Sequence, residues 1–239
     1  MVTTPRASNK GADMKTLTIS VGDLHGKDYW REIDIDKYDL IVFLGDYTDS
    51  FTESNVDILH NLKAVIKLKK RLKNKVVLLW GNHDVQYYFI NDETKRCSGY
   101  RPEARFDLYE QFNKNRHLFQ LAYQKDNYLW THAGIHKGWF DAEYPFGDIT
   151  AIADGLNKMF NERIQSIFDV GWMRGGMASV GGPLWLDKRM LIKKPVKGLH
   201  QIVGHTASKE IKTYNYDEET SVTICDVLQT ETKFHELEF

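Results

Sequence analysis

The chain is poor in cysteine, carries almost no net charge and lacks long apolar runs. Its two cysteines, Cys97 and Cys225, cannot build a disulfide framework and do not stand in a paired metal-ligand spacing, so we predict a reducing compartment and a cytoplasmic protein. The formal net charge of -1 gives no bulk electrostatic reason to expect nucleic acid or an anionic membrane as a partner. No apolar run approaches the roughly 20 residues that a spanning helix needs, so we predict no membrane partner.

What the chain does contain is an ordinary globular composition. Hydrophobic residues make up 42% and charged residues 27% of the 239 positions, enough for a sizeable core. Residues 1–14 are polar and lack an apolar signal core, so they are interpreted as a disordered N-terminal leader. No internal repeat, low-complexity tract or linker divides the rest, which predicts a single domain over residues 15–239.

Short apolar runs alternate with amphipathic stretches, which favours an α/β layered fold. Six runs predict strands, at Thr16–Val21, Asp39–Leu44, Val76–Trp80, Tyr128–Thr131, Gln201–Val203 and Ser221–Cys225. Three longer stretches predict helices, at Asn55–Asn74, Glu103–Ala122 and Ile149–Phe168. The basic run Lys67–Lys75 is interpreted as the solvated face and positive end of the first helix, and the glycine-rich segment Gly171–Arg189 as a long functional loop.

Polar side chains follow five of the predicted strands, at the point where each strand ends. The loops read GDLHG (22–26), GDYTD (45–49), GNHD (81–84), THAG (131–134) and GHT (204–206). Glycine begins four of the five loops, because it allows the chain to turn sharply beside an ion. Ligands at strand ends along one sheet edge can converge on a single crevice, so we expect one site.

The candidate metal ligands in these loops are Asp23, His25, Asp46, Asn82, His132 and His205. Carboxylate, imidazole and amide ligands without thiolate suit manganese, iron or zinc in a reactive site rather than a structural zinc site. Six ligands are too many for one tetrahedral ion and suit two ions that share a bridging carboxylate.

The ordered motifs, which span Gly22–Thr206, resemble those of the calcineurin-like metallophosphoesterases, in particular the branch with serine/threonine phosphoprotein phosphatases and phage-type phosphatases. This resemblance implies an αββα sandwich of two mixed β-sheets flanked by helices, with the metal site at strand ends. It implies two divalent ions, with manganese expected and iron, zinc, nickel or magnesium as alternatives. Asp23 and His25 would bind the first ion and Asp46 would bridge both.

In the same resemblance, Asn82, His132 and His205 would complete the second metal site. His83 would act as general acid, oriented by Asp49. The interpretation of Asp84 is a supporting role in which it holds the loop or a ligand histidine.

Two departures from the family pattern bear on the substrate. No second histidine follows His205 by two residues, unlike in the nuclease and phosphodiesterase branches, which favours phosphomonoesters. Ser50 stands where the protein phosphatases carry an arginine that grips the phosphate. Phosphate recognition prefers a bidentate guanidinium, so Arg174 is the first candidate for that contact, Arg101 the second and Arg189 the third.

The function predicted from the sequence is hydrolysis of phosphomonoesters, with phosphoserine or phosphothreonine as the default group, by a metal-dependent phosphatase. The partner is then a phosphorylated substrate, either a phosphoprotein or a small phosphoester. One alternative is hydrolysis of nucleotides, dinucleoside polyphosphates or phosphodiesters on the same site. Another is a catalytically silent metal-binding scaffold that works through protein contacts.

Overall fold

The structure, a computed structural model, describes residues 15–239 and contains two five-stranded β-sheets over that range. The predicted leader at 1–14 lies outside the described residues. The strands of the first sheet are, in spatial order, β10 (His235–Glu238), β1 (Leu17–Val21), β2 (Leu40–Phe43), β3 (Val76–Leu79) and β4 (Phe119–Gln120). Those of the second are β5 (Ala122–Lys125), β6 (Tyr128–Thr131), β7 (His200–Val203), β9 (Ser221–Ile224) and β8 (Lys212–Asn215).

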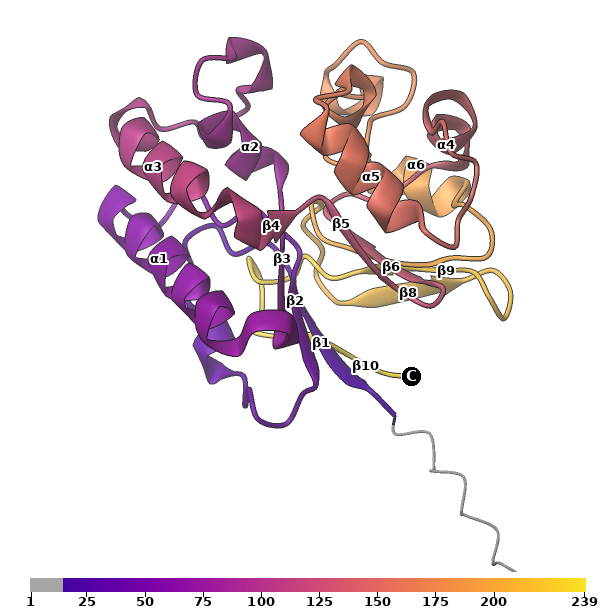
Figure 1. Ribbon diagram of the computed structural model, residues 1–239, viewed down its shortest axis with the longest axis horizontal. Helices are drawn as coiled ribbons and strands as arrows, with labels where there is room; N and C mark the ends of the chain where they lie inside the picture. The colour runs from indigo at the N-terminus through magenta and orange to yellow at the C-terminus, as the bar shows by residue number, and fades with distance from the viewer. Residues whose placement is uncertain (1–14) are drawn as a thin grey trace, which may run out of the picture.

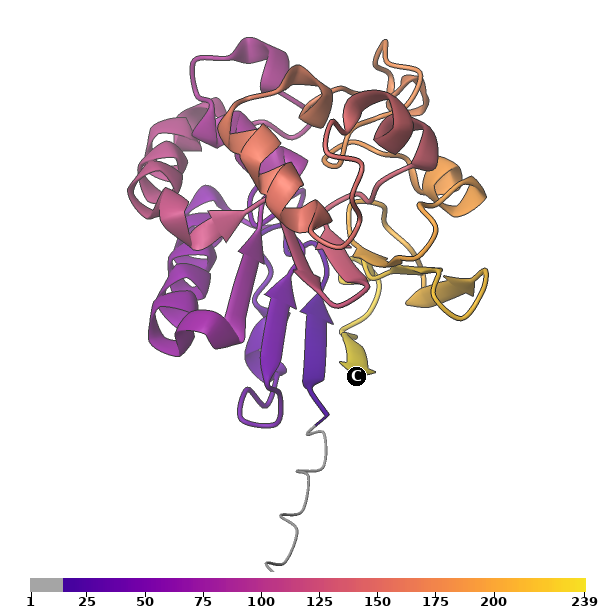
Figure 2. The ribbon, with the colours of Figure 1, turned by 45° about the vertical axis from the view of Figure 1, so that its right-hand side comes forward.

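Both sheets are mixed, and in both the antiparallel strands lie at the edges. β1, β2, β3 and β4 are parallel, and β10 joins β1 antiparallel with Ser20 opposite His235. In the second sheet β6, β7 and β9 are parallel, with β5 and β8 antiparallel at the two edges. Figure 2 shows β1, β2 and β3 running side by side toward the same edge of the first sheet, so the loops that follow them lie together.

Helices cover the outer faces of the two sheets. The α-helices are α1 (Asn55–Leu72), α2 (Asn82–Tyr88), α3 (Arg105–Asn115), α4 (Lys137–Glu143), α5 (Ile152–Asn161) and α6 (Lys188–Lys193). Short 3-10 turns lie at Tyr29–Glu32, Lys73–Lys75, Glu93–Lys95, Pro102–Ala104, Arg116–Leu118, Gln165–Ile167 and Trp172–Arg174. α1 and α3 lie against the first sheet, and α4, α5 and α6 lie over the second (Figure 1). The order helix, sheet, sheet, helix confirms the predicted αββα sandwich.

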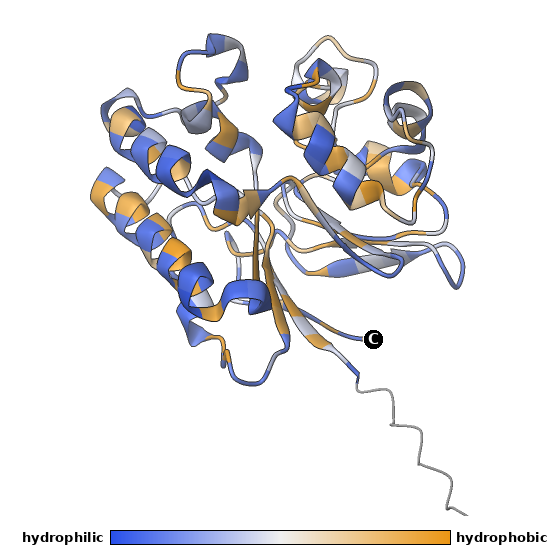
Figure 3. Cartoon of the chain, in the orientation of Figure 1, coloured by the Kyte–Doolittle hydropathy of each residue, from blue (hydrophilic) through white to orange (hydrophobic). Residues whose placement is uncertain are grey.

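Successive side chains along a strand point to opposite faces, so the first sheet contributes to two apolar layers. In β2, Leu40 and Val42 pack with Trp130 of β6 between the sheets. The intervening Ile41 and Phe43 belong to the cluster formed with the outer helices. Successive strand residues point to opposite faces, so a continuously apolar run is required where both faces are covered. Figure 3 shows this apolar colouring on the central strands, while α1 and α3 alternate hydrophilic and hydrophobic residues.

Several predicted elements are wrong in extent. The helix expected over Glu103–Ala122 ends at Asn115, and Phe119–Gln120 forms β4. The helix expected over Ile149–Phe168 covers only Ile152–Asn161. The elements that were not predicted also include α2, α4, α6, β5, β8 and β10, because these short or polar segments depend on tertiary contacts rather than on their own pattern.

Within residues 15–239, no helix has the length and apolar character needed to cross a membrane.

Candidate metal centre

The predicted ligands come from both sheets and meet between them. The loops after β1, β2 and β3 supply residues from the first sheet, and the loops after β6 and β7 supply residues from the second. Two triads of side chains result, Asp46 with His132 and His205, and Asp23 with His25 and Asp46. The expectation of one sheet edge was therefore too simple, since the site lies where the edges of two sheets face each other.

The backbone of this site adopts a conformation that non-glycine residues rarely use. His25, Asp46, Asp49 and His205 have φ values of 45°, 51°, 55° and 65°. The left-handed region is sterically unfavourable for residues with a side chain, at a cost of roughly 1–3 kcal/mol each. Four of the seven such residues in the described chain belong to this site, so the surrounding contacts hold its loops against local strain.

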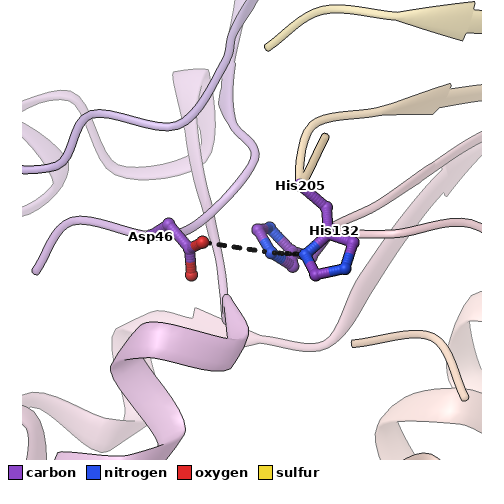
Figure 4. A group of neighbouring side chains, drawn as sticks. All are labelled: Asp46, His132 and His205. Atoms are coloured by element: carbon purple, nitrogen blue, oxygen red, sulfur yellow. Dashed lines mark hydrogen bonds and ion pairs between the residues drawn. The ribbon is translucent and has the colours of Figure 1, made fainter. Parts of the chain in front are cut away.

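Figure 4 shows the triad of Asp46, His132 and His205, whose ligand atoms converge. Asn82 adds a fourth ligand atom beside them. His132 Nε2 lies 3.3 Å from Asp46 Oδ2 and 3.1 Å from His205 Nδ1. Asn82 Oδ1 lies 2.8 Å from His132 Nε2 and 2.9 Å from His205 Nδ1. A divalent ion bound octahedrally at about 2.1 Å keeps adjacent ligand atoms about 3.0 Å apart, so these separations fit a single ion.

The protonation of these groups also calls for a cation. His132 Nδ1 lies 2.8 Å from the Leu44 carbonyl oxygen, which can only accept, so Nδ1 carries a proton and Nε2 faces the Asn82 and Asp46 oxygens. Burial would lower the pKa of His132, but the carboxylates of Asp46 and Asp23 raise it to about 9, so the cavity favours a positive charge at this place. A divalent ion would supply that charge and leave Nε2 free to act as a ligand.

The other triad is built in the same manner. His25 Nδ1 lies 3.0 Å from the carbonyl oxygens of both Thr48 and Asp49, so it donates there and Nε2 presents its lone pair. His25 Nε2 then lies 4.0 Å from Asp23 Oδ2 and 3.9 Å from Asp46 Oδ2. Asp46 is common to both triads, which places its carboxylate where a bridging ligand would be.

The carboxyl and imidazole groups here lack a compensating charge. Burial raises the pKa of Asp23 well above its ordinary value, and Asp226 adds to the rise. Burial, with His132 and Arg174 nearby, holds the pKa of His205 well below its ordinary value. The Nε2 atom of His205 is buried and has no hydrogen-bond partner among the described residues. These residues therefore fit divalent ions.

Two glycines let the ligands approach the neighbouring backbone. A Cβ atom on Gly81 would lie 2.1 Å from Asp46 Oδ1, and one on Gly204 would lie 2.2 Å from Asp23 Oδ1. Both distances are far inside van der Waals contact, so any side chain at either position would displace a ligand. Glycine at the start of these loops is thus required by the packing of the carboxylates.

Asp84 ties the loop after β2 to the start of α2. Its Oδ2 atom accepts from the Asp46 and Gly81 backbone N–H groups at 2.8 and 3.0 Å. Its Oδ1 atom accepts from the Tyr47 and Thr48 backbone N–H groups at 2.9 and 3.3 Å. The predicted supporting role is therefore to hold a loop, and no hydrogen bond to a ligand histidine accompanies it among the residues described.

His83 and Asp49 form a pair beside the metal ligands. His83 Nδ1 lies 2.8 Å from Asp49 Oδ2, and Gln86 Nε2 and the Tyr87 hydroxyl donate to the same carboxylate. The His83 ring lies edge-on to His25, with 5.1 Å between ring centroids. Burial alone would lower the pKa of His83, but the Asp46 charge and the hydrogen bond with Asp49 raise it well above its ordinary value. The arrangement can hold and release a proton.

Two of the three candidate arginines reach the edge of this site. Arg174 donates through Nη2 to Thr206 Oγ1, next to His205, and its Nε lies 3.3 Å from Asp187 Oδ2. Arg101 donates to the backbone carbonyl of Ser50, the position that lacks the family's arginine. Arg189 instead bonds to Asp187 at 2.8 Å with a largely exposed side chain. The structure therefore brings Arg174 and Arg101 to the site and leaves Arg189 at its periphery.

Two residues near the site were missed by the sequence reasoning. Asp226 lies two residues after the end of β9, as Asp23 lies two residues after the end of β1. That position at a strand end could have identified it from the sequence. Its side chain is 3% exposed and its Oδ1 has no hydrogen-bond partner among the described residues. Cys97 lies 3.6 Å from His83 Nδ1 through its Sγ atom, and nothing in its sequence neighbourhood indicated that contact.

Comparisons with solved structures give only distant similarities. A protein serine/threonine phosphatase from Saccharomyces cerevisiae is 13% identical, with 94% of this chain and 79% of that chain covered and a TM-score of 0.47. A metallophosphoesterase from Sphaerobacter thermophilus is 14% identical, with 90% and 77% covered and a TM-score of 0.40. With TM-scores below 0.5, these similarities carry no argument here. No curated protein matches the chain.

The sequence model of one family does match, over most of the chain. It is described as calcineurin-like phosphoesterase and covers residues 19–231, a range that includes all five loops. The motif order, the αββα layers and the converging ligands agree with that match. The chain therefore belongs to the calcineurin-like phosphoesterase family of metal-dependent phosphoester hydrolases.

Proposed function

We propose that the protein is a phosphomonoesterase that uses two divalent ions, with manganese as the expected metal. The observation that carries this proposal is the His83–Asp49 pair, because a proton donor beside two sets of metal ligands is what cleavage of a phosphate ester from a poor leaving group requires. Asp23, His25 and Asp46 would hold one ion, and Asp46, Asn82, His132 and His205 the other. The chemistry that such ions supply is neutralisation of phosphate charge and activation of a water molecule for in-line attack.

The protein's own residues would then manage the proton and the phosphate. Asp49 holds His83 through Nδ1, which leaves Nε2 as the nitrogen that can protonate the departing oxygen. This transfer typically contributes about 10²–10⁴-fold to the rate. Gln86 and Tyr87 hold the Asp49 carboxylate, so the imidazole keeps its orientation through the reaction.

The arginines support a monoester rather than a diester. A phosphomonoester carries a second negative charge, and guanidinium groups recognise such phosphates in a bidentate manner. Arg101 contacts the backbone at Ser50, so a guanidinium stands close to the position where the family pattern would place one. Arg174, from the segment between α5 and α6, lies beside His205 through its hydrogen bond to Thr206. Ala207 stands where the phosphodiesterase branch carries its additional histidine.

The test compares two monoesters that differ in leaving group. Wild type and His83→Gln are assayed with manganese on p-nitrophenyl phosphate, whose leaving group departs with little help, and on a phosphoserine peptide, whose alkoxide must be protonated. We expect the variant to lose about 10²-fold or more on the peptide and distinctly less on the nitrophenyl ester. His117→Ala, an exposed histidine outside the site, is the matched control and should behave as wild type.

The same assay also tests the two alternative functions. Faster hydrolysis of bis-p-nitrophenyl phosphate or of a dinucleoside polyphosphate than of either monoester would replace the proposal with the phosphodiester or nucleotide alternative. Equal losses of His83→Gln on both monoesters would exclude His83 as the proton donor. Absence of turnover on all of them, with metal bound, would favour a catalytically silent scaffold.

A further inference from the structure

A third group of potential metal ligands lies next to the metal centre and shares none of its residues. Asp49, His83 and Cys97 each offer one atom, and the three atoms lie within 4.8 Å of one another. They come from the loop after β2, the first turn of α2 and the loop that follows α2. The group differs from the two triads because it contains a thiol, the ligand type that selects zinc over manganese.

The thiol is held in place rather than free to swing away. The Cys97 backbone N–H donates to Gln86 Oε1 at 3.0 Å, and Asn82 Nδ2 lies 3.7 Å from Cys97 Sγ. Gly99, at φ 82°, brings the following backbone against Asp49, where an added Cβ would lie 3.5 Å from the aspartate Cβ. Cys97 is partly exposed, so an ion can reach it from solvent.

The separations suit a tetrahedral ion. Zinc–sulfur bonds of about 2.3 Å and zinc–nitrogen bonds of about 2.05 Å, at a tetrahedral angle, place the two ligand atoms about 3.5 Å apart. Cys97 Sγ and His83 Nδ1 are 3.6 Å apart. The hydrogen-bonded His83 Nδ1 and Asp49 Oδ2 are 2.8 Å apart, and zinc would open them to about 3.4 Å. One thiolate and one carboxylate also balance the charge of a divalent ion.

We propose that Asp49, His83 and Cys97 form an inhibitory site for zinc, with water in the fourth position. An imidazole that binds zinc through Nδ1 has lost the hydrogen bond with Asp49 and can no longer become the imidazolium that releases a proton. Zinc would therefore stop the reaction without removing the metals of the two triads. The existence of the site is independent of the proposed function, whereas its inhibitory effect rests on the role of His83 given above.

The first test is metal binding, which needs no turnover. Cadmium is added to the manganese-loaded protein in the presence of a phosphine reductant, and the ultraviolet thiolate-to-cadmium charge-transfer band is recorded. We expect a band at one equivalent in wild type and in Cys225→Ser, which alters the core cysteine, and no band in Cys97→Ser or Cys97→Ala. A band that persists in the Cys97 variants, or no band in wild type, overturns the site.

The second test is inhibition, with each variant compared with its own zinc-free rate on the phosphoserine peptide. Zinc should lower the wild-type rate by about 10²-fold or more, and Cys97→Ser should need at least about tenfold more zinc for half inhibition. Equal sensitivity of the two proteins would mean that zinc acts by displacing manganese from the triads, and refutes the proposal. A cadmium band without any zinc inhibition overturns the inhibitory effect and also counts against His83 as proton donor.

Discussion

Replacing Asp84 by asparagine tests how the metal centre is supported. Each Asp84 oxygen accepts from two backbone N–H groups, Oδ2 from Asp46 and Gly81, and Oδ1 from Tyr47 and Thr48. An asparagine side chain has only one accepting oxygen, so its NH₂ group must face two N–H donors in either orientation. The variant is nearly isosteric, so the change isolates hydrogen bonding from packing.

The magnitude follows from the lost contacts. Asparagine leaves two backbone N–H groups without an acceptor, and each such group in the interior costs about 1–3 kcal/mol. Part of this is offset because a neutral amide is easier to bury: burial raises the pKa of Asp84 to about 7, so the ionised group carries a cost of its own. We expect a net loss of about 2–4 kcal/mol in the free energy of unfolding.

The assay is urea unfolding at pH 8, where Asp84 is ionised, with thermal unfolding as a second readout. A loss of that size corresponds to a melting temperature lower by about 4–16 °C for a domain of this length. Manganese affinity should also fall by about 10–100-fold, since the Asp46 backbone is no longer fixed. Asp107→Asn, an exposed aspartate on α3, is the control. A change below about 0.5 kcal/mol in the free energy of unfolding, with unaltered metal affinity, would refute the role of Asp84 in holding this loop.

Three further outcomes are expected. Burial lowers the pKa of His235 to about 4, so the unfolded chain binds more protons than the folded one between pH 6.5 and 4. The free energy of unfolding should therefore fall by up to about 3 kcal/mol as the pH drops through that window. His235→Gln should lose this part of the pH dependence in urea titrations. Gly204→Ala should weaken manganese binding by calorimetry about tenfold or more, because the new methyl group displaces Asp23, whereas Gly147→Ala, which meets nothing within 4 Å, should not. Removing the metal with a chelator should lower the melting temperature reversibly, because each site filled at a metal concentration of 100 Kd stabilises the fold by about 2.7 kcal/mol. An unchanged melting temperature would argue against metal between the sheets.

The central strands and the ligand loops could be predicted because their signals are local. β2 and β3 are buried on both faces, so their residues are apolar without interruption, and the loops that follow carry the polar groups. Glycines with steric reasons to be there start these loops, which made the motifs recognisable one by one. The layered class then followed from the alternation of such runs with helices.

The elements that were missed lack such local signals. β10 has the sequence HELE and becomes a strand only because β1 offers it a free edge. Apolar residues at Phe119 and Leu121 continued the helical pattern of α3, and the chain leaves the helix there because β3 pairs with β4. Cys97 reaches the site from the loop after α2, a placement set by folding of that loop over Asp49. Such contacts depend on the whole fold.

The joining of two sheets by the metal centre has a consequence for how the protein is made. The His205 backbone N–H donates to both carboxylate oxygens of Asp23, at 3.0 and 3.1 Å, across a separation of 182 positions. At synthesis rates of about 5–20 residues per second, Asp23 precedes His205 by about 10–40 s on the ribosome. Through that interval the nascent first sheet has an uncovered apolar face and an incomplete ligand set. Metal capture by the triad of Asp46, His132 and His205 is therefore a late event, and the growing chain needs protection from aggregation until the second sheet is complete.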